Sequence, residues 1–249
     1  MQRTSRILLA TASALLISLA AGCGGGTDGT APASSSLAQG TSESTAPLTK
    51  ESFVSGLLTA IDAHSTVHLS VDTGGSDTGE ADVRYGGGET LIGVEANSEL
   101  RGPSRFVITK GAVFVEQTQG GMWSKIDGND PSYGELIKTF TEIGPRDSVA
   151  GIGAGITSVF RDGKREVDGR ELTVYRLEVD PTKAQGAFKA LAGTSGISET
   201  VVFDFFVDSD NLLRLVETVS AGQKATVALT GWDEPVTIDL PATNQVITY

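Results

Sequence analysis

The sequence predicts an α+β domain, in which one large antiparallel sheet carries a few helices packed on one of its faces. Segments with the pattern of strands outnumber segments with the pattern of helices by roughly three to one. The strands are joined by short connections, as antiparallel neighbours are. Several strands alternate apolar and polar residues, so each has one apolar face that amphipathic helices can cover.

The chain opens with a segment of the secretory signal type. Arg3 and Arg6 precede an uncharged apolar run from Ile7 to Ala21, which is shorter than the roughly 20 residues that span a bilayer. Small residues then lead to Cys23, the single cysteine of the chain, so no disulfide can form within one molecule. We assign residues 1–22 to a cleaved signal peptide. A secreted protein with an unmodified thiol remains the alternative at this point.

Residues 24–47 read as a flexible tether. Twenty of these 24 residues are Gly, Ser, Thr, Ala or Pro, a composition that cannot bury a core. The folded domain is therefore expected at 48–249. Loss of the signal peptide removes two positive charges, which takes the net charge from −12 to −14. This acidity argues against nucleic acid and against an anionic membrane surface as partners.

One amphipathic helix opens the domain. Phe53, Leu57, Leu58 and Ile61 share one helical face, and Thr49 can cap the first turn. Strands bounded by Gly, Asp or Pro are then expected at 67–71, 80–85, 90–96, 105–109, 112–117 and 123–126.

In the middle of the domain, the residue pattern changes from that of strands to that of a helix. Tyr133, Leu136, Ile137 and Phe140 have helical spacing, which predicts a helix over 132–142 that Pro145 ends. The glycine-rich stretch 144–160 is expected to be a flexible lid or loop. Its glycines do not match the dinucleotide-binding spacing, and no strand precedes them.

In the last third of the domain, apolar and polar residues alternate clearly. A turn at 167–170 leads into a strand with Tyr175 and Leu177 on its apolar face. Asp180 is expected to cap a helix that begins with Pro181. Further strands are expected at 201–208, 212–220, 224–230 and 236–240. Residues on one side of that third helix are Ala184, Ala187, Phe188 and Leu191, and the strand at 201–208 places Phe203 and Phe205 together on one face.

The sequence offers little for catalysis. His64 and His68 are the only histidines, and neither lies beside a nucleophile motif. No Cys/His cluster has metal spacing, and the segment 208–211 lacks the glycine and the distal glutamate of a calcium loop. We therefore expect a protein that is not an enzyme and that has no metal and no cofactor.

Two sets of motifs resemble known proteins. The segment Leu19-Ala20-Ala21-Gly22-Cys23 resembles the lipobox of bacterial lipoproteins, with Ala20 where leucine is usual; in that family the cysteine thiol is acylated. The order of elements resembles the LppX/LprA/LprF/LprG lipoproteins of actinobacteria, whose fold is similar to that of LolA and LolB. The matching motifs lie at 121–126, 175–180, 206–214 and 234–246.

This resemblance implies a strongly curved antiparallel sheet, a half-barrel, with helices against its concave side. It also implies a monomer anchored through acylated Cys23 on the extracytoplasmic face of the cell membrane, which carries or presents an acyl lipid or lipoglycan. The residues expected to line the lipid cavity are Phe53, Leu57, Ile61, Phe114, Tyr133, Ile137, Phe140, Tyr175, Leu177, Phe188, Leu191, Phe203 and Phe205. The alternative is a filled core, in which case the same scaffold is a ligand-free protein-interaction or sensory module.

Acylation of Cys23 can be tested by fractionation. Cys23→Ala should move the protein from the membrane fraction to the soluble fraction, because several acyl chains hold a protein firmly at a bilayer. The check is membrane partition together with mass spectrometry of the N-terminal peptide. An unchanged partition, with no lipid mass on that peptide, would contradict the assignment.

Overall fold

The computed structural model describes residues 47–75, 77–86, 89–99, 102–117, 121–129, 139, 143–194, 198–220 and 223–248. The predicted signal peptide, Cys23 and the tether up to residue 46 lie outside these ranges, as does the helix predicted over 132–142 except for Thr139. Among the described residues, no helix is both long enough and apolar enough to cross a membrane.

The described chain forms one twelve-stranded sheet in the order β12-β6-β5-β4-β3-β2-β1-β11-β10-β9-β8-β7. Neighbouring strands are antiparallel, except that β12 runs parallel to β6. The helices are α1 (Lys50–Ile61), α3 (Pro145–Gly153), α4 (Gly186–Thr194) and the 3₁₀ turn η3 (Thr243–Gln245). The strands are β1 (Thr66–Asp72), β2 (Thr78–Gly86), β3 (Glu89–Ser98), β4 (Gly102–Thr109), β5 (Ala112–Glu116), β6 (Trp123–Asp127), β7 (Ile156–Val167), β8 (Arg170–Val179), β9 (Val201–Val207), β10 (Leu213–Ser220), β11 (Gln223–Thr230) and β12 (Val246–Thr248).

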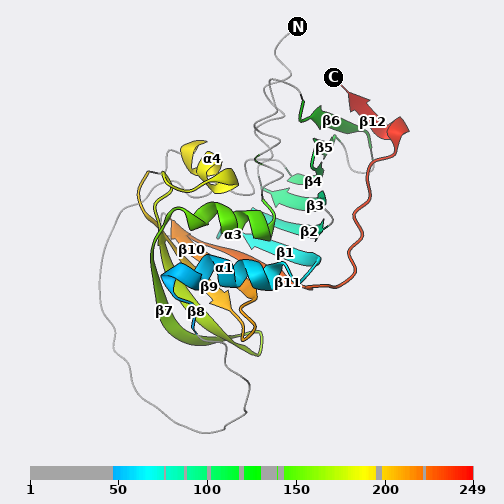
Figure 1. Cartoon of the computed structure of the whole chain (residues 1–249). Coiled ribbons are helices and arrows are strands. Elements are labelled where there is room, and N and C mark those ends of the chain that lie inside the picture. The colour runs from blue at the N-terminus through cyan, green and yellow to red at the C-terminus, as the bar shows by residue number, and fades with distance from the viewer. Residues whose placement is uncertain are drawn as a thin grey trace.

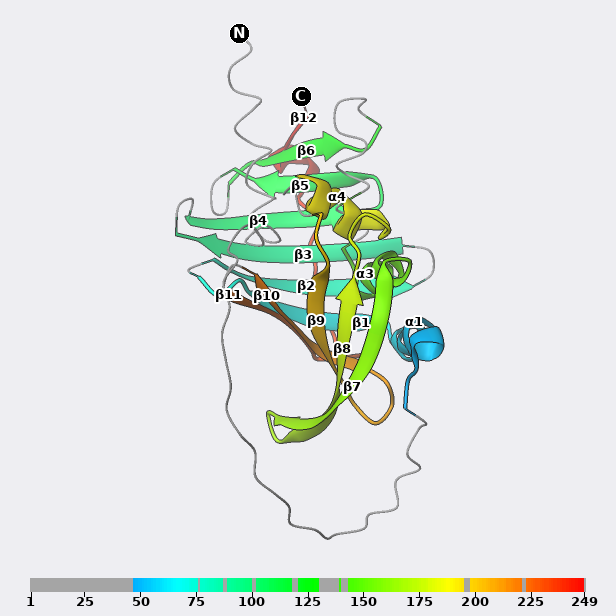
Figure 2. The ribbon, with the colours of Figure 1, turned by 90° about the vertical axis from the view of Figure 1, so that its left-hand side faces the viewer.

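The sheet curves strongly into a half-barrel that does not close. Figure 2 shows β7, β8 and β9 running upright while β2, β3 and β4 run across the view. The helices α1, α3 and α4 lie on the same side of the sheet, its concave side (Figure 1). The predicted fold class, an α+β half-barrel with helices on the concave face, is thereby confirmed.

Local signals place α1 where the sequence predicts it. Thr49 is the N-cap, and it forms a reciprocal pair of hydrogen bonds with Ser52: the Thr49 backbone N–H donates to Ser52 Oγ at 2.9 Å, and the Ser52 N–H donates to Thr49 Oγ1. Phe53, Leu57 and Ile61 are fully buried against the sheet. The capped, amphipathic first helix is confirmed.

The glycine-rich stretch 144–160 is not a flexible loop, so this prediction was wrong. Pro145 occupies the first turn of the helix α3, and β7 begins at Ile156. The glycines serve close packing. A Cβ atom at Gly151 would lie 2.8 Å from Gln185 O, and one at Gly155 would lie 2.6 Å from Asp180 O.

Because these glycines have no Cβ atom, neighbouring backbone segments approach closely enough to form hydrogen bonds. The Gln185 N–H donates to Gly151 O and the Asp180 N–H donates to Gly155 O, both at 2.8 Å. On the other side of α3, a Cβ at Gly153 would lie 3.2 Å from a methyl group of Val54 on α1. Each glycine therefore holds α3 against a neighbour, which is a packing role that composition alone does not reveal.

The third helix starts later than predicted. Asp180 caps a short turn instead, where its carboxylate accepts a hydrogen bond from the Thr182 N–H. Hydrogen bonds from Lys183 and Thr182 lower the pKa of the Asp180 carboxyl to about 2. The helix α4 begins only at Gly186, whose φ of +61° is a left-handed conformation that a continuous helix cannot contain.

The strand predicted at 236–240 is absent, although all of its residues are described. Residues 234–242, here called the strap, instead cross the convex face of the sheet and lead to β12 beside β6 (Figure 1). Ile238 packs on Gly93, where a Cβ atom would lie 3.2 Å from the isoleucine methyl. Because the strap lies on a face of the sheet and not at its edge, it has no ladder to join.

Polar contacts fix the start of the strap. The Asp233 carboxylate lies 2.6 Å from His64 Nδ1 and accepts a hydrogen bond from the Ser65 N–H at 2.9 Å. These hydrogen bonds, that from Ser65 first, lower the pKa of Asp233. Thr66 Oγ1 donates to Glu234 O at 2.8 Å, so the strap is tied to the first residue of β1.

The packing role of the glycines can be tested with Gly155→Ala. The added methyl group would meet Asp180 O at 2.6 Å and a methyl of Val179 at 3.0 Å, so it should destabilise the domain by about 1–3 kcal/mol. The free energy of unfolding in denaturant measures this. Gly75→Ala is the matched control, since nothing lies within 4 Å of its added atom. Equal stabilities of the two variants would show that segment 144–155 packs loosely.

Candidate functional site

A cavity of about 260 Å³ lies between the concave face of the sheet and the helices α3 and α4. It is partly open to solvent, and 20 of its 21 described lining residues are apolar. The lining residues are Leu69, Val71, Ala81, Ile92, Val94, Phe106, Ile108, Val113, Ile143, Pro145, Ser148, Val149, Ile152, Ala187, Phe188, Phe203, Phe205, Leu213, Val216, Val227 and Leu229.

Strand register builds the floor of the cavity. Residues directly opposite one another in an antiparallel pair place their side chains in contact on one face. One row of such neighbours runs Phe205, Val216, Val227, Val71. A second row runs Leu229, Leu69, Ala81, Val94, Phe106. The floor is thus apolar across seven strands.

Ala81 gives the floor its depth. It is a buried residue in the middle of the second row, between Leu69 on one neighbouring strand and Val94 on the other. A methyl group between two branched side chains leaves a hollow in an otherwise even surface. The cavity therefore depends on the small size of this side chain.

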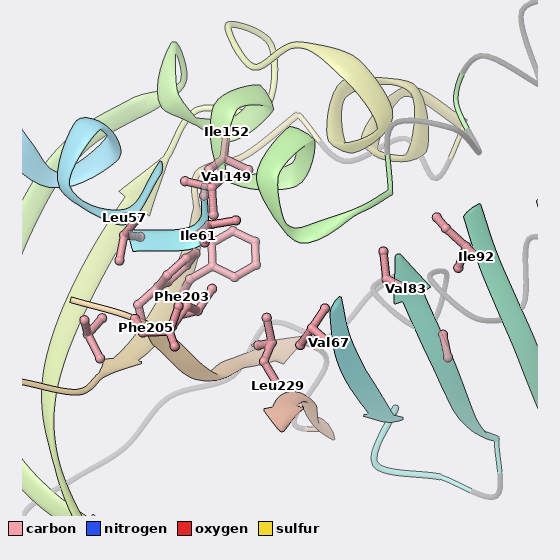
Figure 3. Close-up of a cluster of buried hydrophobic side chains, with 14 of the residues drawn as sticks. Leu57, Ile61, Val67, Val83, Ile92, Val149, Ile152, Phe203, Phe205 and Leu229 are labelled. Carbon is pink, nitrogen blue, oxygen red and sulfur yellow. The ribbon is translucent and has the colours of Figure 1, made fainter. Parts of the chain in front are cut away.

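Helix α3 forms most of the roof. Pro145, Ser148, Val149 and Ile152 recur at helical spacing, so they share the face that looks down on the sheet. Figure 3 shows Val149 and Ile152 extending from α3 toward Ile61 and the ring of Phe203. On α4, Phe188 meets Phe203 edge to face with ring centroids 5.6 Å apart, which bounds the cavity on that side.

The described lining contains no ionisable side chain. Its one polar group, the Ser148 hydroxyl, donates at 3.2 Å to Ile143 O, just before the start of α3. Arg146, next to this wall, is paired with Asp62 at 2.8 Å. The cavity can therefore take an apolar group, and its described walls hold nothing that would fix a charged one.

An unfilled apolar cavity of this size is costly. In closed cores, each Å³ of residual cavity lowers stability by about 24 cal/mol, because the lining atoms lose their contacts. Apolar cavities stay dry and take up apolar ligands, so an occupying hydrocarbon would recover much of the lost contact energy.

The residues predicted to line a lipid cavity fall into separate groups. Phe188, Phe203 and Phe205 line the cavity. Five others are buried beside it in a filled core under α1 and do not line it: Phe53, Leu57, Ile61, Tyr175 and Leu177.

Packing of the filled core explains this division. The ring of Phe53 makes edge-to-face contacts with Tyr175 at 5.4 Å and with Phe205 at 5.6 Å. The hydroxyl of Tyr175 accepts a hydrogen bond from the Leu48 N–H at 3.0 Å, so that polar atom is satisfied without a ligand. Helix α1 therefore packs directly on β8 and β9 through these contacts.

Phe114 was predicted to line the cavity, and the structure places it elsewhere. It pairs across the sheet with Val107 and Lys125 and lies near Leu240 of the strap, on the convex face. Its neighbour Val113 lines the cavity instead. A shift of one residue along a strand reverses the face, and the short segment 112–116 is apolar on both faces because its first four residues are all apolar.

The remaining predicted residues are not tested by the structure. Tyr133, Ile137 and Phe140 lie outside the described residues, and so does the side chain of Leu191. Several lining residues from the first four strands were not predicted from the sequence. They are pairs of apolar residues two positions apart, on one face of a strand: Leu69 and Val71, Ile92 and Val94, Phe106 and Ile108. Alternation identifies an apolar face, but it does not show which part of that face a helix leaves uncovered.

The two histidines are tied to carboxylates. His64 pairs with Asp233, and His68 Nδ1 lies 2.9 Å from Asp82 Oδ1 on the neighbouring strand. Neither residue lines the apolar cavity. In the part of the chain that the structure describes, no group of three or more His, Cys, Asp or Glu side chains could hold a metal ion.

No family model matches the chain, and no curated protein matches its sequence. Among solved structures, it is similar to the Mycobacterium tuberculosis lipoprotein LppX, with 16% identity, a TM-score of 0.55, and coverage of 76% of this chain and 98% of that one. It is similar also to LprF from Mycobacterium bovis, with 14% identity, a TM-score of 0.55, and coverage of 78% and 97%. At these identities the likeness shows the fold, and the resemblance to LppX and LprF is confirmed at that level.

The hollow under α3 can be tested with Ala81→Leu. If the site is a cavity, the larger side chain fills it and should stabilise the ligand-free domain by about 0.5–2 kcal/mol. In a filled core the same change would destabilise it by about 1–3 kcal/mol. The sign of the change in unfolding free energy therefore decides between the two.

Ala184→Leu serves as the control for overpacking. Ala184 is fully buried but does not line the cavity, so its substitution should destabilise the domain. If Ala81→Leu lowers stability as much as Ala184→Leu does, no usable space exists beside Ala81.

Proposed function

We propose that this chain is an extracytoplasmic lipoprotein, anchored to the cell membrane through acylated Cys23, that binds an acyl lipid in the cavity under α3. It acts as a monomer and carries or presents the lipid in the cell envelope. The observation that carries the proposal is the apolar cavity, whose walls have the chemistry of a hydrocarbon site. The N-terminal segment and the likeness in fold to the lipoprotein LppX agree with it.

The division of the concave face also supports binding over a purely structural role. The half under α1 is filled by its own side chains, with Phe53, Leu57 and Ile61 fully buried. The half under α3 and α4 is hollow, although the same kinds of side chain surround it. A protein that needed only a stable core would gain stability by filling both halves.

Binding can be measured with an environment-sensitive fluorescent fatty acid. The protein for this test is the chain without its signal peptide and with Cys23→Ala, after extraction of bound lipid. It should bind the probe, and organic extracts of untreated protein should contain acyl lipid by mass spectrometry. Ala81→Phe should weaken probe binding at least about tenfold, because its ring occupies the floor of the cavity.

Val202→Phe is the matched control. Val202 lies on the convex face and is 43% exposed, so the same ring added there should leave probe binding unchanged. Suppose instead that no lipid is extracted and that the probe does not bind to a folded protein. The lipid-carrier proposal then fails, and a ligand-free interaction or sensory module takes its place.

A further inference from the structure

We infer that the strap, residues 234–242, is a releasable brace behind the floor of the apolar cavity. While the strap is docked, it restrains β2, β3 and β4 from the convex side of the sheet. When it lifts, these strands loosen and a bound ligand leaves faster. The inference rests on the proposed function for its ligand and adds a means of regulating ligand release.

The strap lies directly behind the cavity floor. Gly93 in β3 has no side chain on the convex face, and Ile238 of the strap packs on it there. Its chain neighbours Ile92 and Val94 point to the opposite face and line the apolar cavity. The same strand therefore contacts the strap with one face and would contact the ligand with the other.

The floor strands have little support on either face. A second hollow, with polar walls, lies between the strap at Thr237 and Asp239 and the convex face of the sheet. Ala81, Val94 and Phe106 border both this hollow and the apolar cavity. Here the sheet is a single layer between two spaces, so few packed atoms oppose its movement.

The strap is held mainly at its two ends. At its start, Asp233 and Glu234 form hydrogen bonds with the segment 64–66. At its end, β12 adds only three residues to β6. Between these ties, no hydrogen bond joins the described residues 235–241 to the sheet, and none of these residues is buried. Such exposed, weakly bonded segments open far more readily than the ladders of a sheet.

Like charges also oppose docking of the strap. Asp239 lines the same hollow as Asp82 and Glu95 of the sheet. The basic groups of this lining are already paired with the sheet carboxylates: His68 Nδ1 lies 2.9 Å from Asp82, and Arg105 Nε lies 3.2 Å from Glu95. Repulsion between the carboxylates across the hollow therefore makes the strap easier to lift.

A disulfide can lock the strap in place. A Cβ atom at Gly93 would lie 3.8 Å from Ile238 Cβ, a separation typical of disulfides. Gly93→Cys with Ile238→Cys, in the chain without its signal peptide and with Cys23→Ala, gives one protein that is locked when oxidised and free when reduced. The disulfide should form under mild oxidation. Its failure to form in folded protein would show that the strap does not rest on Gly93.

Hydrogen exchange measures the restraint. Locking should slow exchange of the backbone amides of β2, β3 and β4 at least about fivefold, because their opening requires the strap to lift. The amides of β8 and β9 lie away from the strap and should keep their rates, which controls for general stabilisation by a disulfide. Equal rates in the oxidised and reduced protein, or equal slowing in all five strands, would overturn the inference.

One charge change should act like a partial lock. Asp239→Asn removes a carboxylate from the hollow, so it should slow amide exchange in β2, β3 and β4 of the chain that lacks the engineered cysteines. Asp210→Asn, in the exposed turn after β9, changes the net charge equally and should leave these rates unchanged. Identical rates in the two variants would contradict the role of repulsion in releasing the strap.

Release of the fluorescent fatty acid measures the coupling to the cavity. The probe should leave the oxidised disulfide variant at least about fivefold more slowly than the reduced one, a modest coupling between two sites. Equal release rates would overturn the inference while lipid binding stands. If the probe binds to neither form, the proposed function fails, and the exchange rates alone still decide whether the strap restrains the floor.

Discussion

The structure depends on one constraint: a sheet of twelve strands has a wider apolar concave face than its helices fill. Rows of side chains in register, such as Phe205, Val216, Val227 and Val71, make that face continuous. Helix α1 fills its part of the face with large side chains. Helix α3 is only nine residues long and contains Gly151 and Gly153, so it covers its part without filling it. The cavity is the space that remains between α3 and the sheet.

Close backbone packing makes this roof stable despite its low helix propensity. Glycine in a helix costs about 0.5–1 kcal/mol relative to alanine. Here the cost is offset by contacts that only glycine permits, with Gln185 O above Gly151 and Val54 beside Gly153. The strap packs closely on a glycine in the same way, on the convex face of the sheet. It crosses the convex face over Gly93 and ends in β12, which pairs with β6 and thereby covers the edge of that strand.

Features determined by neighbouring residues were predictable. The Thr49 cap, the buried face of α1, and the alternation of Phe203 and Phe205 depend on contacts within a few positions of the chain, and they appear where expected. The turn at 167–170 belongs to the same group, because Asp168 and Gly169 both adopt the positive φ that a tight hairpin requires. The resemblance to the LppX and LprF lipoproteins likewise led to the correct fold.

By itself, then, the sequence determined the α+β class, the first helix, most strands and the apolar faces, because periodicity and caps act locally. Only the tertiary structure decided the rest. The glycines of 151–155 become a helix and its end through contacts with Asp180 and Gln185. Phe114 takes the convex face because strand pairing sets its register, and residues 236–240 lose their strand because no ladder is within reach. The cavity exists because the side chains of the helices do not fill all the space above the concave face of the sheet. Residues from many strands and helices form it, so no short segment of the chain predicts it.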